Sequence, residues 1–206
     1  MSPMPDARAS LIHVLRSACS GELAAVHAYR GHGKSLRSDA PERERVLLIE
    51  SEERHHRELV IGLLAQLGAG PSAKREALFW CIGNTISILC RIGGWFIPMY
   101  GAGRLESTNI KEYEDAAKFA QAAGLTDMID CLLTMAEVEW EHEKFFREQI
   151  LGHWMLRFFP IWKTPPPKET IRAPYALEVG FEAGVEIEDQ QRHGHAEEQR
   201  PTECAL

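Results

Sequence analysis

The segment AEVEWEHEKFF at residues 136–146 decides the fold class, because it places an acid and a histidine on one face of a predicted helix. Glu139 and His142 are three residues apart, so both side chains project from the same side of an α-helix. They lie within an apolar stripe at helical spacing, formed by Leu132, Met135, Phe146 and Ile150. The stripe predicts a helix from Thr126 to about Ile150 that buries a carboxylate and an imidazole.

A second segment, SEERHHREL at residues 51–59, repeats the pattern with Glu53 and His56. The stripe around this pair contains Val46, Ile49, Val60, Leu63 and Leu67. Glu52 and His55 have the same spacing one residue earlier, but their stripe passes through Arg45, Leu48, Leu59, Gly62 and Gln66, a poorer core face. We favour Glu53 and His56 and keep the other pair open, on a helix from Pro41 to about Leu67.

Two further helices carry a single glutamate each in the apolar stripe. The first runs from about Asp6 to His32 and contains Glu22. The other begins near Lys74, includes the apolar stretch at residues 77–103, is expected to kink around residues 93–98, and continues through Glu106 to Gly124. No alternating strand pattern occurs in residues 1–160. The prediction is an all-α four-helix bundle with a long apolar crossover segment and an irregular C-terminal tail.

Buried carboxylates need compensating positive charge, which the helix stripes do not supply. Two divalent cations would balance four glutamates, and two histidines would add neutral nitrogen ligands. This is the ligand set of the di-iron and di-manganese carboxylate bundles. Oxygen and imidazole ligands without thiolate suit iron, with manganese as an alternative in one site. The predicted metal ligands are Glu22, Glu53, His56, Glu106, Glu139 and His142.

Composition excludes several other classes of protein. The net charge of -7 disfavours a nucleic-acid partner, because phosphate binding needs a basic surface. The five scattered cysteines contain no CxxC pair, which disfavours a disulfide framework, a zinc ribbon or a rubredoxin-type iron site. Residues 1–162 are expected to form the bundle domain. Residues 163–206, which begin with a Pro-rich stretch and include His193 and His195, are expected to form a poorly ordered linker and polar tail.

The motifs resemble the demethoxyubiquinone hydroxylases of the ferritin-like superfamily over roughly residues 10–150. The resemblance is carried by GELAAVHAYRGH at 21–32, EERHH at 52–56, ESTNIKEYE at 106–114 and EVEWEHEKFF at 137–146. In that family a Tyr follows the glutamate by seven residues, which Tyr29 and Tyr113 match. The chain departs from the family at Glu112, where a His is typical. It also has only HWMLRFFPIWK at residues 153–163 where a further apolar helical hairpin is usual.

The resemblance implies an oxygen-dependent di-iron monooxygenase that hydroxylates a polyprenylated quinone ring in ubiquinone synthesis. It implies O2, a quinone-type lipid and an electron donor such as NADH or a reductase as partners. Tyr29 and Tyr113 are candidate catalytic residues beside the metals, as partners of the ligands or radical-prone neighbours, and the alternative for both is a hydrogen-bonded core tyrosine. The expected location is cytoplasmic, with peripheral attachment to the inner membrane, and a homodimer is left open. No residue run has the length and apolarity of a clean membrane-spanning helix.

Two other functions fit the same ligands. A rubrerythrin-like peroxidase or ferroxidase would have a closed site reached only by small molecules, and an iron-binding protein would have no turnover. A quinone hydroxylase predicts an open apolar channel to the metals, which we expect to be lined by residues such as Trp80, Ile88, Trp95 and Phe96. The shape of the site therefore discriminates between these functions.

Overall fold

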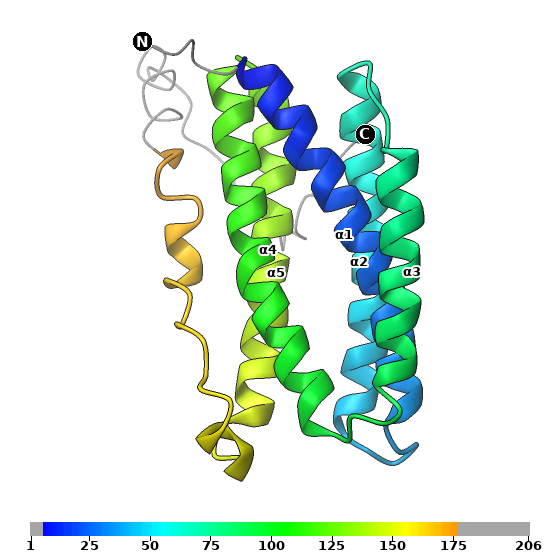
Figure 1. Ribbon diagram of the computed structural model, residues 1–206. Helices are drawn as coiled ribbons and strands as arrows, with labels where there is room; N and C mark the ends of the chain where they lie inside the picture. The colour runs from blue at the N-terminus through cyan, green and yellow to red at the C-terminus, as the bar shows by residue number, and fades with distance from the viewer. Residues whose placement is uncertain (1–5, 177–206) are drawn as a thin grey trace, which may run out of the picture.

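The computed structural model describes residues 6–176, and this part of the chain is all-helical, with no strand (Figure 1). The five α-helices are α1 (Ala7–Ser35), α2 (Glu42–Gln66), α3 (Ala73–Leu89), α4 (Phe96–Ala122) and α5 (Ile129–Ile150). Three 3-10 turns accompany them: η1 (Thr126–Met128), η2 (Trp154–Arg157) and η3 (Lys168–Thr170). The all-α class predicted from the sequence is confirmed for these residues.

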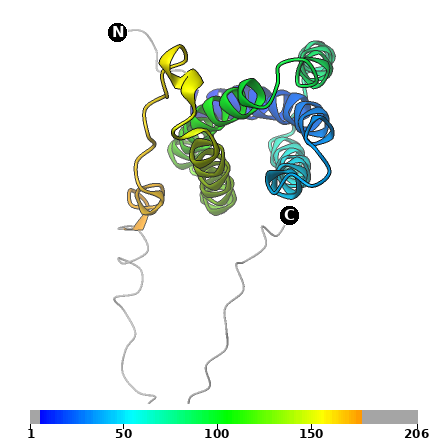
Figure 2. The same cartoon turned by 90° about the horizontal axis from the view of Figure 1, so that it is seen from below.

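Two helical hairpins make up the bundle. Helix α1 packs against α2 and α4, and α4 packs along α5. The hairpins α1–α2 and α4–α5 thus stand side by side, with α2 and α5 facing each other on the side away from the α1–α4 contact (Figure 2). Asp6 begins α1 by accepting a hydrogen bond from the backbone N–H of Arg8, as an N-cap residue does.

The prediction of one kinked helix over residues 74–124 is wrong. The chain ends α3 at Leu89, turns through residues 90–95 and begins α4 at Phe96, running back in the opposite direction (Figure 1). Gly94 has a φ of +68°, a backbone conformation that favours glycine, and Pro98 lies in the first turn of α4, where proline is tolerated. Helix α3 is consequently a fifth helix outside the bundle, packed on α1.

Small residues let α3 approach α1 closely. A Cβ atom at Gly83 of α3 would lie 2.6 Å from the backbone oxygen of Ala24. A Cβ atom at Gly31 of α1 would meet the backbone and side chain of Ser87, with its Cα 2.4 Å away. The absence of side chains at these two positions is therefore required for the observed contact.

The apolar core has two parts, one at each end of the bundle. One part includes Leu11, Leu15, Leu63 and Leu132, near the start of α1 and the end of α2. The other includes Val46, Ile49, Phe96, Phe146 and Ile150, near the opposite end. The polar residues predicted as metal ligands lie between these two parts, so the protein encloses them from both ends.

The first part of the expected tail, residues 163–176, packs against α5. Arg172 donates hydrogen bonds to Glu137 at 2.7 Å and Asp130 at 2.6 Å, and the indole N–H of Trp140 donates to the carbonyl of Pro166 at 2.8 Å. Ile171 is buried in the core. The Pro-rich composition did not indicate these long-range contacts. The rest of the expected tail, with His193 and His195, lies outside the described residues.

Within residues 6–176, none of the helices combines the length and apolarity needed to cross a membrane. This agrees with the sequence prediction for the stretch at 77–103, which Asn84, Arg91 and Pro98 interrupt. The turn at residues 90–95 divides that stretch between α3 and α4.

Candidate metal centre

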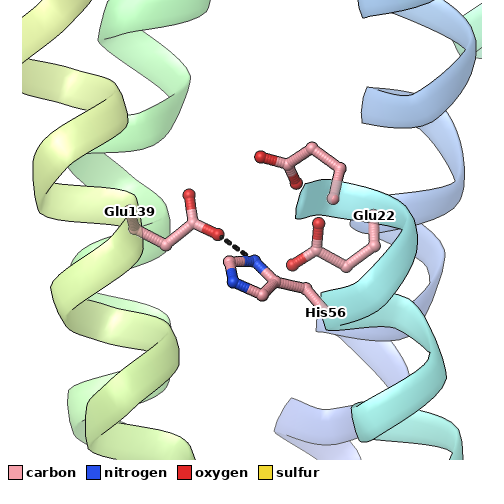
Figure 3. Close-up of side chains that lie close together, drawn as sticks. Glu22, His56 and Glu139 are labelled. Atoms are coloured by element: carbon pink, nitrogen blue, oxygen red, sulfur yellow. Dashed lines mark hydrogen bonds and ion pairs between the residues drawn. The ribbon is translucent and has the colours of Figure 1, made fainter. Parts of the chain in front are cut away.

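The structure brings the six predicted ligand side chains together between the two hairpins. They form two groups of four that share Glu53 and Glu139: the first group adds Glu22 and His56, and the second adds Glu106 and His142. Within each group one ligand atom from every side chain lies within 4.8 Å of the others, and all the side chains are buried. Figure 3 shows Glu22, His56 and Glu139 converging from α1, α2 and α5. This buried cluster is compatible with a metal site.

Helical register explains which residues of α2 point inward. Glu53 and His56 are 0% and 3% exposed, whereas His55 is exposed to solvent. Glu52 is half-buried at the edge of the cluster. The alternative pair Glu52 and His55 therefore does not enter the cluster, because successive residues differ by about 100° around a helix.

Each histidine bridges α2 and α5. Nδ1 of His56 donates to Oε1 of Glu139 at 2.9 Å. Nε2 of His142 donates to Oε2 of Glu52 at 2.8 Å, since a carboxylate only accepts. Nδ1 of His142 lies 3.0 Å from Oε1 of Glu53 without hydrogen-bonding geometry. The contact with Glu52 thus turns the second ring nitrogen of His142 toward the glutamates.

The two tyrosines connect one hairpin to the other. The hydroxyl of Tyr29 on α1 donates to Glu106 on α4, and the hydroxyl of Tyr113 on α4 donates to Glu22 on α1. Burial, together with the adjacent carboxylates, raises the pKa of both tyrosines well above its usual value. Both therefore stay protonated and act as donors that hold one oxygen of each glutamate.

Burial and mutual repulsion disfavour charge on most of the glutamates. Burial raises the pKa of Glu22 and of Glu106 well above the usual range, with repulsion from Glu53 and Glu139 at Glu22 and from Glu139 at Glu106. Burial, with repulsion from Glu139 and Glu106, raises the pKa of Glu53 to about 7. Burial opposes charge on Glu139 as well, but the adjacent imidazoles of His142 and His56 hold its pKa well below the usual range. Without metal, protons compensate for the charge of this cluster.

Several buried ligand atoms have no hydrogen-bond partner among the described residues. They are Oε2 of Glu22, both carboxylate oxygens of Glu53 and Nδ1 of His142. Unpartnered buried polar atoms are rare in folded proteins and usually mark a ligand or ion. All of these atoms are hard oxygen or imidazole nitrogen donors, and they face the interior of the cluster. The residues therefore fit a pair of divalent cations.

Three polar residues at the site were not predicted as participants. Glu52, which the sequence offered only as an alternative ligand, orients His142. Asn109 of α4 donates from Nδ2 to Oε2 of Glu106 at 3.0 Å and to Oε2 of Glu139 at 3.4 Å. His32 is 2% exposed, and its Nε2 has no hydrogen-bond partner among residues 6–176. Asn109 follows Glu106 by three residues, a spacing that could have been read as a same-face pair.

An apolar cavity of about 420 Å³ lies between α1, α3 and α4 and reaches the cluster at Tyr29, Glu106 and Asn109. Its apolar lining includes Phe79, Ile82, Ile86, Leu89, Ile97 and Leu105. The lining residues named from the sequence are wrong: Trp80 and Ile88 are 52% and 64% exposed, and neither they nor Trp95 and Phe96 line the cavity. The neighbouring positions of α3 face inward instead, because α3 packs on α1 as a separate helix.

Comparisons of the chain with protein-family models, with curated proteins and with solved structures give no match. The interpretation of the site therefore depends on its geometry and on the sequence motifs.

Proposed function

We propose that this chain is a di-iron, oxygen-dependent monooxygenase that hydroxylates a quinone-type ring carrying an isoprenoid tail. The observation that supports this function best is the apolar cavity that leads to Glu106 and Tyr29 of the metal centre. A volume of about 420 Å³ falls within the range of small-molecule sites, roughly 300–1,000 Å³. A closed bundle with access only for small oxidants would have no need of such a cavity.

The six clustered side chains would hold the two ions, with Glu53 and Glu139 shared between them. An iron pair bound there would supply the redox chemistry that activates O2. In the overall reaction one atom of O2 enters a ring C–H bond and the other leaves as water. A reductant such as NADH supplies two electrons and one proton, and the second proton comes from solvent. The tyrosine hydroxyls orient two glutamates, Glu52 orients His142, and the two apolar core regions exclude water.

The shape of the cavity favours a long apolar ligand with a polar head. The cavity extends along α1 from Gly21 to His32, which is about 16 Å at 1.5 Å per residue. Its polar groups Tyr29, Glu106 and Asn109 lie next to the ligand cluster, and His32 lies at one end of the α1 wall, whereas α3 contributes mostly apolar side chains. A ring oxygen would meet the polar end, and a prenyl chain would occupy the apolar length.

Attachment to a membrane surface is part of the proposal. Large apolar side chains are exposed at one end of the bundle, in the α3–α4 turn and around η2 (Figure 1). They include Ile88, Leu89, Ile92, Leu151, Trp154 and Phe158, with exposures of 50% to 78%. Exposed Arg91 and Arg157 accompany them. Apolar, Trp and Arg side chains together are typical of interfacial segments, and a lipid substrate would enter from such a surface.

The first test is metal content. Protein loaded with Fe²⁺ under anaerobic conditions should contain about two ions per chain by elemental analysis. Glu53→Ala and Glu139→Ala should lose both ions, because each residue belongs to both groups. Glu22→Ala and Glu106→Ala should retain about one ion each. Glu58→Ala, at an exposed position of α2, is the matched control and should bind metal as the wild type does.

The second test is turnover. With a reductant and ¹⁸O2, the iron-loaded protein should convert a short-chain demethoxyubiquinone into a product that carries one ¹⁸O atom. Absence of stoichiometric metal in the wild type would refute the metal centre. Stoichiometric iron with rapid reduction of hydrogen peroxide, and no hydroxylated quinone, would instead establish the peroxidase alternative.

A further inference from the structure

Asn109, on α4, has no counterpart on α1, although the two helices otherwise contribute matching residues to the site. Each half has a glutamate followed by Tyr at plus seven, on α1 and on α4. Three residues after the glutamate, α1 has Ala25 and α4 has Asn109. Of the two glutamates on α1 and α4, Glu106 alone therefore has an amide three residues further along its own helix.

The amide of Asn109 lies between the ligand cluster and the cavity. Its Nδ2 donates to Glu106 and Glu139, two carboxylates of the second group. The same side chain lines the cavity. The hydrogen bonds of Asn109 in the described part of the chain use Nδ2, so the carbonyl Oδ1 is available as an acceptor.

The cavity reaches the second group alone. Of the six clustered side chains only Glu106 lines it, together with its partner Tyr29 and with Asn109. The residues that distinguish the first group, Glu22 and His56, do not line it. A ligand in the cavity would thus approach the centre from the side of Glu106.

We infer that Asn109 binds the polar head of the ligand and sets its orientation at the second metal position. Oδ1 would accept a hydrogen bond from a ring hydroxyl of a quinol. For a quinone, the N–H that makes the long 3.4 Å contact with Glu139 would donate to a ring carbonyl instead. This inference rests on the proposed function, and it names the residue that recognises the ring oxygen. Ala25, which also lines the cavity, has no polar side-chain atom for such a contact.

The test compares Asn109→Ala and Asn109→Leu with Thr108→Ala. Thr108 is the exposed neighbour whose hydroxyl donates only within its own helix, to the carbonyl of Leu105. All proteins are loaded with Co²⁺, and the dissociation constant of a short-chain demethoxyubiquinone is read from the change in visible cobalt absorption. Both Asn109 variants should retain two ions and bind the quinone about tenfold more weakly, as expected for loss of one or two hydrogen bonds. Thr108→Ala should match the wild type.

Three results would overturn the inference. Unchanged quinone affinity in Asn109→Ala would exclude a contact with the ligand. Weakening in Asn109→Leu alone would indicate steric blockage, and loss of one ion from Asn109→Ala would make Asn109 a metal ligand rather than a binding residue for the quinone. A wild-type protein that binds two Co²⁺ but no quinone would overturn the proposed substrate as well, which distinguishes that failure from the first three.

Discussion

At the scale of single residues, the hydrogen bond between Glu52 and His142 determines how an imidazole faces the glutamates. Because Nε2 of His142 is engaged by Glu52 at 2.8 Å, Nδ1 is the nitrogen that remains for an ion. Arg45 holds Glu52 in turn through an ion pair at 2.8 Å. A metal-binding histidine commonly has such a carboxylate behind it, which fixes both tautomer and ring orientation.

Replacement of Glu52 by Ala should weaken metal binding roughly 10- to 100-fold without removing a ligand. The affinity would be measured by titration of the metal-free protein with Co²⁺. Glu58→Ala, on an exposed position of the same helix, provides the control for loss of negative charge. Equal affinities in the two variants would contradict the orienting role of Glu52.

His32 is a second residue with a measurable effect, because its buried environment makes the stability of the protein depend on pH. Burial lowers the pKa of His32 to about 4, against the attraction of the nearby Glu42. The ring stacks on Phe146, with centroids 6.2 Å apart. Since the unfolded histidine binds a proton near pH 6.5 and the folded one does so only near pH 4, acid favours the unfolded state across that interval.

His32 should therefore make the metal-free protein lose stability as the pH falls from 6.5 to 4. The corresponding loss between pH 7 and pH 4.5 is about 2 kcal/mol of unfolding free energy. Urea denaturation at both pH values, for the wild type and for His32→Gln, isolates this contribution from that of the buried glutamates. The variant should lose less stability over the interval than the wild type. Identical losses would refute a neutral, buried His32.

The positions of the clustered glutamates and histidines could be anticipated from sequence because helical periodicity alone determines which face they occupy. Glu53 and His56 follow from the stripe of α2 in this way. The spacing of Asn109 indicated the face it shares with Glu106, but the contacts of Glu52, Asn109 and His32 could not be anticipated, since they depend on which atoms of other helices lie opposite them. That the six clustered residues bind iron stays a prediction.

At the scale of elements, the contact between α1 and α3 forms one wall of the cavity. Helix α3 contributes no side chain to the ligand cluster, but Phe79, Ile82 and Ile86 line the cavity. The sequence showed an apolar stretch at 77–103 and predicted a kink there, but not the reversal of the chain. An all-round apolar helix has no single face, so its packing partner cannot be read from periodicity.

Gly83→Ala should lower the unfolding free energy by about 1–3 kcal/mol, because its Cβ would overlap the backbone of Ala24. Gly101→Ala is the matched control, since a Cβ there meets nothing within 4 Å. This control should gain roughly 0.5–1 kcal/mol, as an alanine in an unobstructed helix does. Chemical denaturation would give both values. Stabilisation by both changes would contradict the close approach of α3 to α1.

At the scale of the whole molecule, the α3–α4 turn and η2 lie at the same end of the bundle (Figure 1). Their exposed apolar side chains come from segments about 60 residues apart in the sequence, for example Ile92 and Trp154. Only the fold brings the two segments to one end.

The double variant Ile92→Glu with Trp154→Glu should reduce co-sedimentation with anionic phospholipid vesicles by at least tenfold, because apolar area is lost and negative charge is added. Leu78→Glu is the control, because Leu78 is 57% exposed but lies toward the other end of α3. This variant should bind vesicles as the wild type does. Metal content should be the same in all three proteins. Equal binding by the double variant would show that this end does not meet the membrane.

The crossed arrangement of the ligands has a consequence for how such a chain could arise. Each group of four takes residues from both hairpins: Glu139 of α5 completes the group of Glu22 and His56, and Glu53 of α2 completes the group of Glu106 and His142. A single hairpin could assemble neither group. If such a chain arose by duplication of one hairpin, the half-length protein would have needed a second copy of itself to complete either group.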